Sequence, residues 1–345
     1  AGGGAAAGVA TALAAPLLAT MGLILWDKHW RGSVFALNLF KASLATLLFA
    51  ATAALSSGGF VELLGSLSLQ GAVALCASSL VGIVIGDTAW LLSIKMLGAR
   101  RVLLVDSLRP FFAAAVGGAV FGERATAAGV ASMSCAVLGV LIVSLEREAD
   151  EKVGSQKPDE RVLGYVLAVA TVVLDVFGMV LTKRFGGGMG PWLIGGLRFG
   201  FAAACLGCIF LACRIRALAR HGRRSPAAVP LGGKAPPDAE APSAAGVGLG
   251  AGPEAPWHTM PAMSAQSWAR ATAGVVFVTF LNPAFSNYAL FALPLSLCLT
   301  LGSLSPVFAI PLVWFLKRER VSARATVGSL LAVVGVIAFL NTAAM

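Results

Sequence analysis

One uncharged stretch decides the fold: residues 271–316 read ATAGVVFVTFLNPAFSNYALFALPLSLCLTLGSLSPVFAIPLVWFL. A helix that crosses the hydrocarbon core of a bilayer needs about 20 predominantly apolar residues, because the core is about 30 Å thick and each helical residue rises about 1.5 Å. The stretch has 46 residues and no charged side chain, which is long enough for two crossings. It therefore predicts a membrane protein rather than a soluble one.

The rest of the chain has the same character. Of 345 residues, 58% are apolar and only 12% are charged, and the mean hydropathy is +0.85, so no large soluble domain remains. Windows of about 19 residues predict ten transmembrane helices. These are residues 5–25, 33–55, 70–92, 102–121, 126–145, 162–182, 191–213, 268–291, 296–316 and 323–343.

Charge and cysteine content exclude several classes of partner. The net charge of +10 comes from basic residues in short loops between predicted spans, which favours anionic lipid headgroups over nucleic acid. All six cysteines fall inside predicted spans, where they act as small apolar residues. Cys205 and Cys208 share a helix face without a histidine or carboxylate beside them, so we expect no metal site and no cofactor.

The sequence contains an internal repeat. Residues 107–113 (SLRPFFA) reappear as residues 303–309 (SLSPVFA), and a Glu-Arg pair follows thirteen residues after each proline, at positions 123–124 and 319–320. Both matches have an offset of 196 residues. Because a repeat with an odd number of spans enters the membrane in the opposite direction the second time, we expect an all-α integral membrane protein with ten transmembrane helices in two inverted five-helix repeats.

The repeat defines the expected domains. Residues 5–145 form the first five-helix unit, residues 146–161 a charged connector, and residues 162–343 the second unit. Within the second unit, residues 217–265 are rich in Ala, Gly and Pro. Such a segment has too little apolar bulk to form a core, so we expect a disordered loop there.

These motifs resemble a known family. The third predicted span ends in Gly-Asp-Thr-Ala-Trp (86–90) and continues into Leu-Gly-Ala-Arg-Arg (97–101), and the fourth carries Ser-Leu-x-Pro-x-Phe-Ala before a Gly-Glu-Arg turn (122–124). This pattern is similar to the EamA unit of the drug/metabolite transporter superfamily, and two such units would account for most of the chain. The resemblance implies an inverted-repeat transporter that moves a small metabolite by alternating access.

Six ionisable residues lie inside the predicted spans: Lys41, Asp87, Asp106, Arg109, Asp175 and Arg198. Each costs about 2.5–3.5 kcal/mol to insert, so each needs a partner or a wet cavity. Three are basic and three acidic, which favours internal pairing. Asp106 and Arg109 stand three residues apart on one helical face and are expected to bridge each other, with direct substrate contact as the alternative.

Lys41 and Arg198 occupy corresponding places in the two repeats. In an inverted repeat the two cations would approach a shared cavity from opposite sides and could hold a phosphate or a carboxylate; otherwise they snorkel to the membrane surface. Asp87 and Asp175 would either neutralise these cations or take up protons, so proton coupling and counter-substrate exchange both stay open. We predict Lys41, Asp87, Arg109, Asp175 and Arg198 as substrate-binding residues.

Uncharged polar residues and prolines complete the predicted site. Asn282, Asn287 and Tyr288 lie in an otherwise apolar span, where they either line the cavity or form hydrogen bonds between helices. Proline removes a backbone hydrogen bond within a span, which allows a hinge or a simple kink. The predicted hinge residues are Pro110, Pro283, Pro306 and Pro311.

The alternatives to transport are an intramembrane enzyme and a non-transporting membrane protein. An intramembrane enzyme is not expected: the sequence around Asp87 lacks the first glycine of the Gly-x-Gly-Asp protease motif, and His29, His221 and His258 all lie in predicted loops. A non-transporting receptor or scaffold on the same duplicated bundle is the alternative function. The solute, the oligomeric state and the membrane are not specified by the sequence.

Orientation is the remaining conflict. Most basic residues follow odd-numbered spans, so the positive-inside rule places both termini outside the cytoplasm. The family resemblance implies cytosolic termini, and we favour that arrangement.

Overall fold

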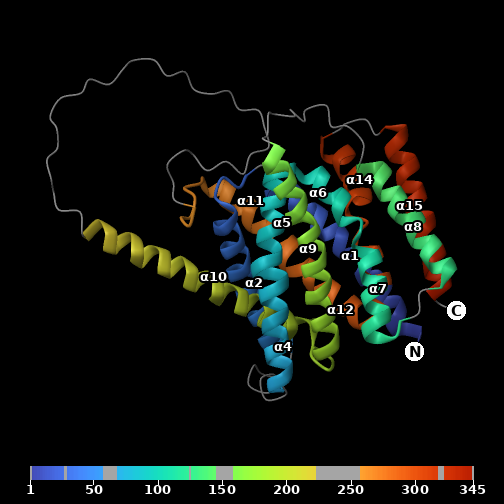
Figure 1. Ribbon diagram of the computed structural model, residues 1–345, viewed down its shortest axis with the longest axis horizontal. Coiled ribbons are helices and arrows are strands. Elements are labelled where there is room, and N and C mark those ends of the chain that lie inside the picture. The colour runs from blue at the N-terminus through green and yellow to red at the C-terminus, as the bar shows by residue number, and fades with distance from the viewer. Residues whose placement is uncertain are drawn as a thin grey trace.

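The computed structural model describes residues 2–26, 29–56, 68–123, 126–144, 158–222, 257–317 and 322–343, and every regular element in these ranges is a helix (Figure 1). The predicted all-α class is confirmed. The first half contains α1 (Gly2–Trp26), α2 (Val34–Ser56), α4 (Leu69–Ser79), the π-helix η1 (Leu80–Asp87), α5 (Thr88–Leu97), α6 (Ala99–Asp106), α7 (Arg109–Phe121) and α8 (Ala127–Ser144). The second half contains α9 (Pro158–Phe185), α10 (Pro191–Gly222), α11 (Ala265–Val275), the π-helix η2 (Val276–Leu281), α12 (Asn282–Ala292), α13 (Leu295–Gly302), α14 (Ser305–Lys317) and α15 (Ala323–Ala343).

Nine helical segments of the described ranges are long and apolar enough to cross a membrane. The region of the fifth predicted span is a shorter apolar helix, Ala127–Val143 within α8. The start of α1 and the end of α15 lie at the same end of the molecule, as an even number of crossings requires (Figure 1). The arrangement is therefore compatible with ten crossings.

The internal repeat is visible in the helix boundaries. Five elements of the first half (α4, η1, α6, α7 and α8) begin 196 residues before α11, η2, α13, α14 and α15 respectively, which is the offset of the sequence repeat. The caps repeat as well: Ser68 accepts a hydrogen bond from the backbone N–H of Gly71, and Ser264 accepts one from Ser267. Since a serine at this position satisfies an otherwise unpaired helix N–H, the same local solution begins both helices.

The predicted span 102–121 is broken rather than continuous. α6 ends at Asp106 and α7 begins at Arg109, and the equivalent helices α13 and α14 are separated in the same way. At each break a serine hydroxyl donates to a backbone oxygen three residues earlier, Ser107 to Leu104 at 2.6 Å and Ser303 to Thr300 at 2.8 Å.

Two of the predicted hinge prolines start helices instead of bending them. Pro110 and Pro306 are the second residues of α7 and α14, where a missing N–H breaks no intrahelical hydrogen bond. Pro283 is the second residue of α12, but α11, η2 and α12 follow one another without a break, so it lies inside a continuous helix, as Pro311 does inside α14. The prediction that a hydrogen bond is removed in mid-helix is therefore wrong for Pro110 and Pro306, and the role of all four prolines as hinges stays a prediction.

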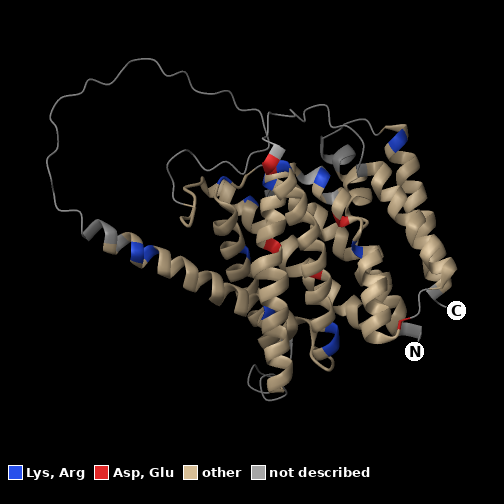
Figure 2. Ribbon diagram, in the orientation of Figure 1, with Lys and Arg blue, Asp and Glu red and all other residues tan. Residues whose placement is uncertain are grey.

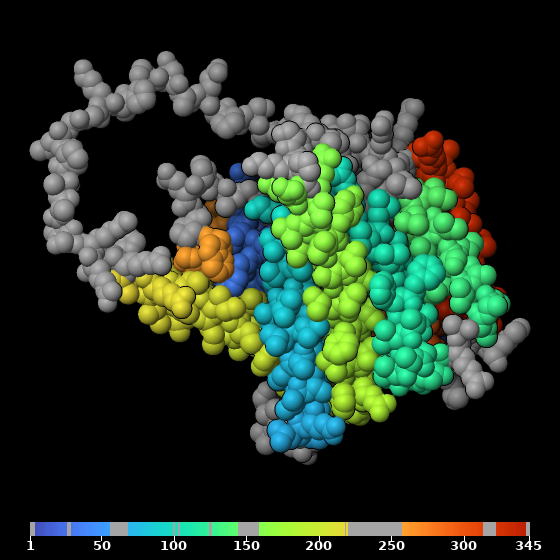
Figure 3. Space-filling view, in the orientation of Figure 1, coloured from blue at the N-terminus to red at the C-terminus, as the bar shows by residue number. Residues whose placement is uncertain are grey.

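The two repeats exchange their first helices. α9 of the second half packs against α4, η1, α5, α6 and α7 of the first, and α1 packs against α11, η2, α12, α13 and α14 of the second. Figures 1 and 3 show α9 lying between α4–α5 and α7. We call α4–α7 with η1 and α9 the first bundle, and α11–α14 with η2 and α1 the second bundle.

Two pairs of equivalent helices join the bundles, α2 with α10 and α8 with α15. The second pair crosses at small residues: at Gly139 a Cβ would collide with the backbone of Ala332, and at Gly335 it would collide with the backbone of Ala136. Small residues allow such close approach of membrane helices, so this crossing depends on glycine at both positions.

The structure describes only the two ends of the loop expected at 217–265. α10 continues to Gly222, and the Trp257 ring lies 5.0 Å from that of Phe35, measured between centroids. The rest of the loop, residues 223–256, lies outside the described ranges, as do residues 146–157 of the connector and the Glu319-Arg320 pair.

Candidate functional site

The π-helix η1 positions the first part of the site. Asn38 of α2 is fully buried, and its side-chain amide donates to the backbone oxygen of Ile83 at 3.2 Å and to the Thr88 hydroxyl at 3.0 Å. Thr88 in turn donates to the backbone oxygen of Val84. A π-turn shifts the hydrogen-bond register of a helix and is frequent at functional sites. These side-chain bonds hold η1 against α2 just where Asp87 ends it.

Lys41 and Asp87 form an ion pair across this contact, with 2.5 Å between Lys41 Nζ and Asp87 Oδ2. The Lys41 side chain is 4% exposed and that of Asp87 is 32% exposed. Lys41 therefore turns into the bundle instead of snorkelling to its surface, and Asp87 keeps one side open.

Arg109 is shared by two carboxylates. Its guanidinium lies 3.5 Å from Asp106 Oδ1, as the three-residue spacing predicts, and 3.4 Å from Asp175 Oδ2 on α9. The indole N–H of Trp90 donates to the other oxygen of Asp106 at 3.3 Å. Arg109 Nε and Asp175 Oδ2 are close enough to attract each other but are not aligned as a hydrogen bond, so both are buried atoms without a hydrogen-bond partner.

Arg198 is the unpaired cation of the site. Among the described residues no carboxylate lies within 4.0 Å of its guanidinium, and its Nε is buried without a hydrogen-bond partner. Its Nη2 lies beside Gly82 of η1, where a Cβ would be 3.2 Å away. Asp175 and Asp87 both act on it electrostatically. Arg198 is therefore attracted by two carboxylates, and its buried Nε–H group has no acceptor.

The six membrane charges therefore meet on one side of the molecule, the first bundle with α2 and α10. Figure 2 shows acidic and basic positions within helices that are otherwise uncharged. The equivalent positions of the second bundle carry Pro283, Gly302 and Ser305 where Asp87, Asp106 and Arg109 stand in the first. We call Lys41, Asp87, Asp106, Arg109, Asp175 and Arg198 the charged wall, and the second bundle has neutral residues at these three equivalent positions.

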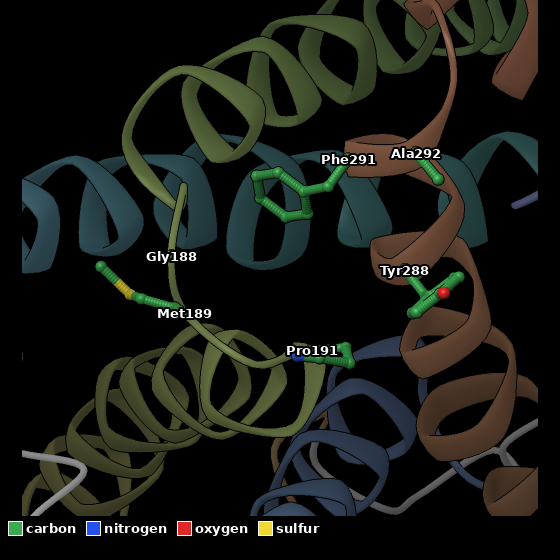
Figure 4. A pocket seen from close by; sticks show the side chains of 6 residues that line it. All are labelled: Gly188, Met189, Pro191, Tyr288, Phe291 and Ala292. Carbon is green, nitrogen blue, oxygen red and sulfur yellow. The ribbon is translucent and has the colours of Figure 1, made fainter. Parts of the chain in front are cut away.

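The predicted α12 residues form no hydrogen bond with the six charged side chains in the described part of the chain. Asn282 bonds within its own helix, accepting from Ser286 at 3.1 Å. Asn287 is 4% exposed, and its side-chain N–H group has no partner. Tyr288 instead lines a pocket of about 330 Å³ between the end of α12 and the α9–α10 turn. Figure 4 shows Tyr288, Phe291 and Ala292 on one side of this pocket and Met189 and Pro191 on the other.

Sequence reasoning missed the groups that hold the charges in place. Asn38, Trp90 and Thr88 were not predicted, although an asparagine one turn before Lys41 in an apolar span was an available signal. No cluster of three or more His, Cys, Asp or Glu residues suited to a metal ion occurs within the described ranges.

Comparison with known proteins agrees with this architecture. Residues 244–341 match the model of the EamA-like transporter family. One solved crystal structure, described only as that of a protein, has a TM-score of 0.68 and 16% identity, and the match covers 98% of each chain. No curated protein matches the sequence. At this level of identity the solved structure shows a shared fold and nothing about function.

The resemblance stated from the sequence motifs is thereby confirmed over residues 244–341. With its apolar helices, the chain is an integral multi-pass membrane protein, and its residues 244–341 are similar to the EamA-like transporter family.

Proposed function

We propose that this protein is a secondary transporter that moves a small polar organic metabolite across its membrane by alternating access. The match to a transporter family supports membrane transport as the general activity, in place of catalysis.

The observation that supports the proposal most strongly is that Arg198 has no carboxylate partner within 4.0 Å among the described residues. The Nε of Arg198 is buried without a hydrogen-bond partner, which is costly, and charged residues inside membrane helices mark solute or ion pathways. A carboxylate or phosphate of the solute would supply the missing partner. Because Arg109 serves two carboxylates, its surroundings keep a net negative charge that suits an amine on the same solute. The solute is therefore anionic or zwitterionic.

Alternating access is supported by an asymmetry between the bundles. α7 packs against α13, which joins the bundles at one end of the molecule. The repeat relates this contact to one between α14 and α6, and these two helices have no comparably extensive contact in the described residues. An inverted-repeat transporter needs a difference of this kind between its two ends in any single state. Asp87 and Asp175 are the groups through which protons or a counter-substrate would be coupled.

Uptake into proteoliposomes tests the proposal, after a metabolite panel has been screened for solutes that raise the thermal midpoint of the purified protein. Arg198→Gln should abolish uptake of the solute and its thermal shift, while Lys95→Gln, which removes an exposed charge at the end of α5, should leave both unchanged. Uptake that survives Arg198→Gln contradicts this site. Absence of flux with every metabolite class would instead favour a receptor or scaffold.

A further inference from the structure

A further ion pair lies near the end of α7, outside the six membrane charges. Gly122 ends α7 in the left-handed conformation (φ 69°), and this turn directs Glu123 back over α7. Its Oε1 lies 2.7 Å from Lys183 Nζ, and its Oε2 accepts the backbone N–H of Leu295 at 2.8 Å. A Cβ on Gly117 would come within 2.7 Å of the same Oε2. Both carboxylate oxygens of Glu123 therefore accept hydrogen bonds, and the carboxylate packs closely against Gly117.

Lys183, near the end of α9, is equally engaged. Besides Glu123, its ammonium group donates to the backbone oxygen of Leu293 at 2.8 Å and lies 5.2 Å from the centre of the Phe121 ring. The Lys183 and Glu123 side chains are only 15% and 19% exposed. We call Glu123 and Lys183 the outer ion pair. Charge-assisted hydrogen bonds of this kind are about twice as strong as neutral ones.

The outer ion pair connects the two bundles. Glu123 and Lys183 both belong to the first bundle or its end, whereas the two backbone groups that they bind, Leu293 O and Leu295 N, belong to the turn between α12 and α13 of the second. Leu295 is the first residue of α13, so its N–H is one of those that a helix leaves unpaired. The pair thus attaches the first bundle to a helix N-terminus of the second.

Its position relative to the charged wall is also defined. Lys183 follows Asp175 by eight residues on α9, which places it about 12 Å further along the helix axis. Arg109 and Asp175 join α7 to α9 deep in the membrane, and Glu123 and Lys183 join the same elements at their ends. The outer ion pair therefore lies between the proposed solute site and the nearest end of the molecule, the end at which α7 packs on α13.

We propose that Glu123 and Lys183 hold this end closed, and that their bonds to the α12–α13 turn break when the transporter opens there. The inference rests on the proposed function, because it assigns these residues to one step of alternating access. The pocket of Figure 4 adjoins the same turn, since Ala292 lines it and precedes Leu293. Opening would extend this pocket inward toward the charged wall.

Cys298 is a native reporter for the test. Cys298 is 5% exposed and lies one turn after Leu295 on α13. It is close enough to Lys183 and Glu123 for their charges to act on its thiol. In a full-length chain whose other five cysteines are replaced by serine, Cys298 should react slowly with a polar methanethiosulfonate reagent. Loss of the outer ion pair should admit the reagent.

The experiment compares labelling rates of the purified protein in lipid nanodiscs. Glu123→Gln and Lys183→Met should each raise the rate at Cys298 by about tenfold or more, because each removes a charge-assisted bond between the bundles. Lys183→Arg, which keeps the cation, should stay within about threefold of the parent. The matched control is Arg184→Gln, which removes an exposed charge beside Lys183, and it should leave the rate unchanged.

Unchanged labelling in Glu123→Gln and Lys183→Met, with thermal midpoints that show folded protein, would overturn the proposal. Equal acceleration in Arg184→Gln would do the same, because it would reveal general loosening of this end. If Glu123→Gln does not fold, Lys183→Gln carries the test, since it leaves Glu123 on the Leu295 N–H. Labelling needs no solute, so failure here leaves the uptake experiment standing, and failed uptake leaves the labelling result interpretable.

Discussion

Lys41 and Asp87 illustrate how this protein keeps charges inside a membrane. Each is bound by the other, and Asn38 and Thr88 satisfy the backbone of the π-helix beside them. A buried pair of this kind is not by itself a source of stability, because removing both charges from water costs about as much as their attraction returns. Removing one member is a different matter, because the remaining charge is left without a partner.

We therefore expect Lys41→Met to destabilise the protein by about 2 kcal/mol, the usual cost of losing a hydrogen bond to a charged group. The double variant Lys41→Met/Asp87→Asn should recover part of that loss, because no unpaired charge remains. Thermal unfolding of the purified variants measures both effects. A double variant less stable than Lys41→Met would show that the two residues do not act as a pair.

The sequence predicted the charged residues of the site better than its neutral ones. Charges in apolar spans need partners, so Lys41, Asp87, Arg109, Asp175 and Arg198 could be expected to converge, and the structure brings them together. A neutral amide or phenol carries no such requirement. Asn282 satisfies itself within α12, and Tyr288 faces the pocket at the helix end, because only the packing decides where these side chains point.

At the scale of the elements, hydropathy located the helices but not their interruptions. The predicted span 102–121 became α6 and α7 because the Ser107 hydroxyl and Pro110 favour a new start over a continuous hydrogen-bond ladder. The π-helices η1 and η2 left no mark in the hydropathy pattern, since a π-turn changes hydrogen-bond register without changing composition. The repeat of 196 residues was readable because both copies kept the same cap and break residues.

The crossing of α8 and α15 should be the contact least tolerant of added volume. Gly139→Leu and Gly335→Leu each place a side chain against the backbone of the opposite helix, and overpacking of this kind costs about 1–3 kcal/mol or more. Gly207→Leu on α10 is the matched control, because a Cβ there meets nothing within 4 Å. Thermal midpoints should fall for the first two variants and not for the third. An equal fall in all three would contradict the packing role of this crossing.

At the scale of the whole molecule, the repeat in the sequence and the unit of packing differ by one helix. The sequence divides the chain near residue 150, but α9 belongs by its contacts to the first bundle and α1 to the second. This exchange could not be predicted from hydropathy, because lipid and a neighbouring helix are equally apolar surroundings for a span. It means that neither half can complete its own bundle.

Splitting the chain tests this statement. Residues 1–150 and 151–345 produced separately should be unstable, since each lacks a helix that its bundle needs. Co-expression should restore a complex that purifies through a tag on either fragment, with a thermal midpoint close to that of the intact chain. A fragment that is stable and monomeric by itself would show that the exchange is not essential to the bundles.

The exchange also sets an order of events during synthesis. α1 is synthesised before its partners, which begin with α11 at Ala265, more than two hundred residues later. At about 5–20 residues per second, α1 waits roughly 10 to 50 s in lipid before the helices that surround it exist. α1 contains no charged residue. This composition is needed during synthesis as well as in the finished protein, because α1 must be stable as a single helix in lipid until α11–α14 have been made.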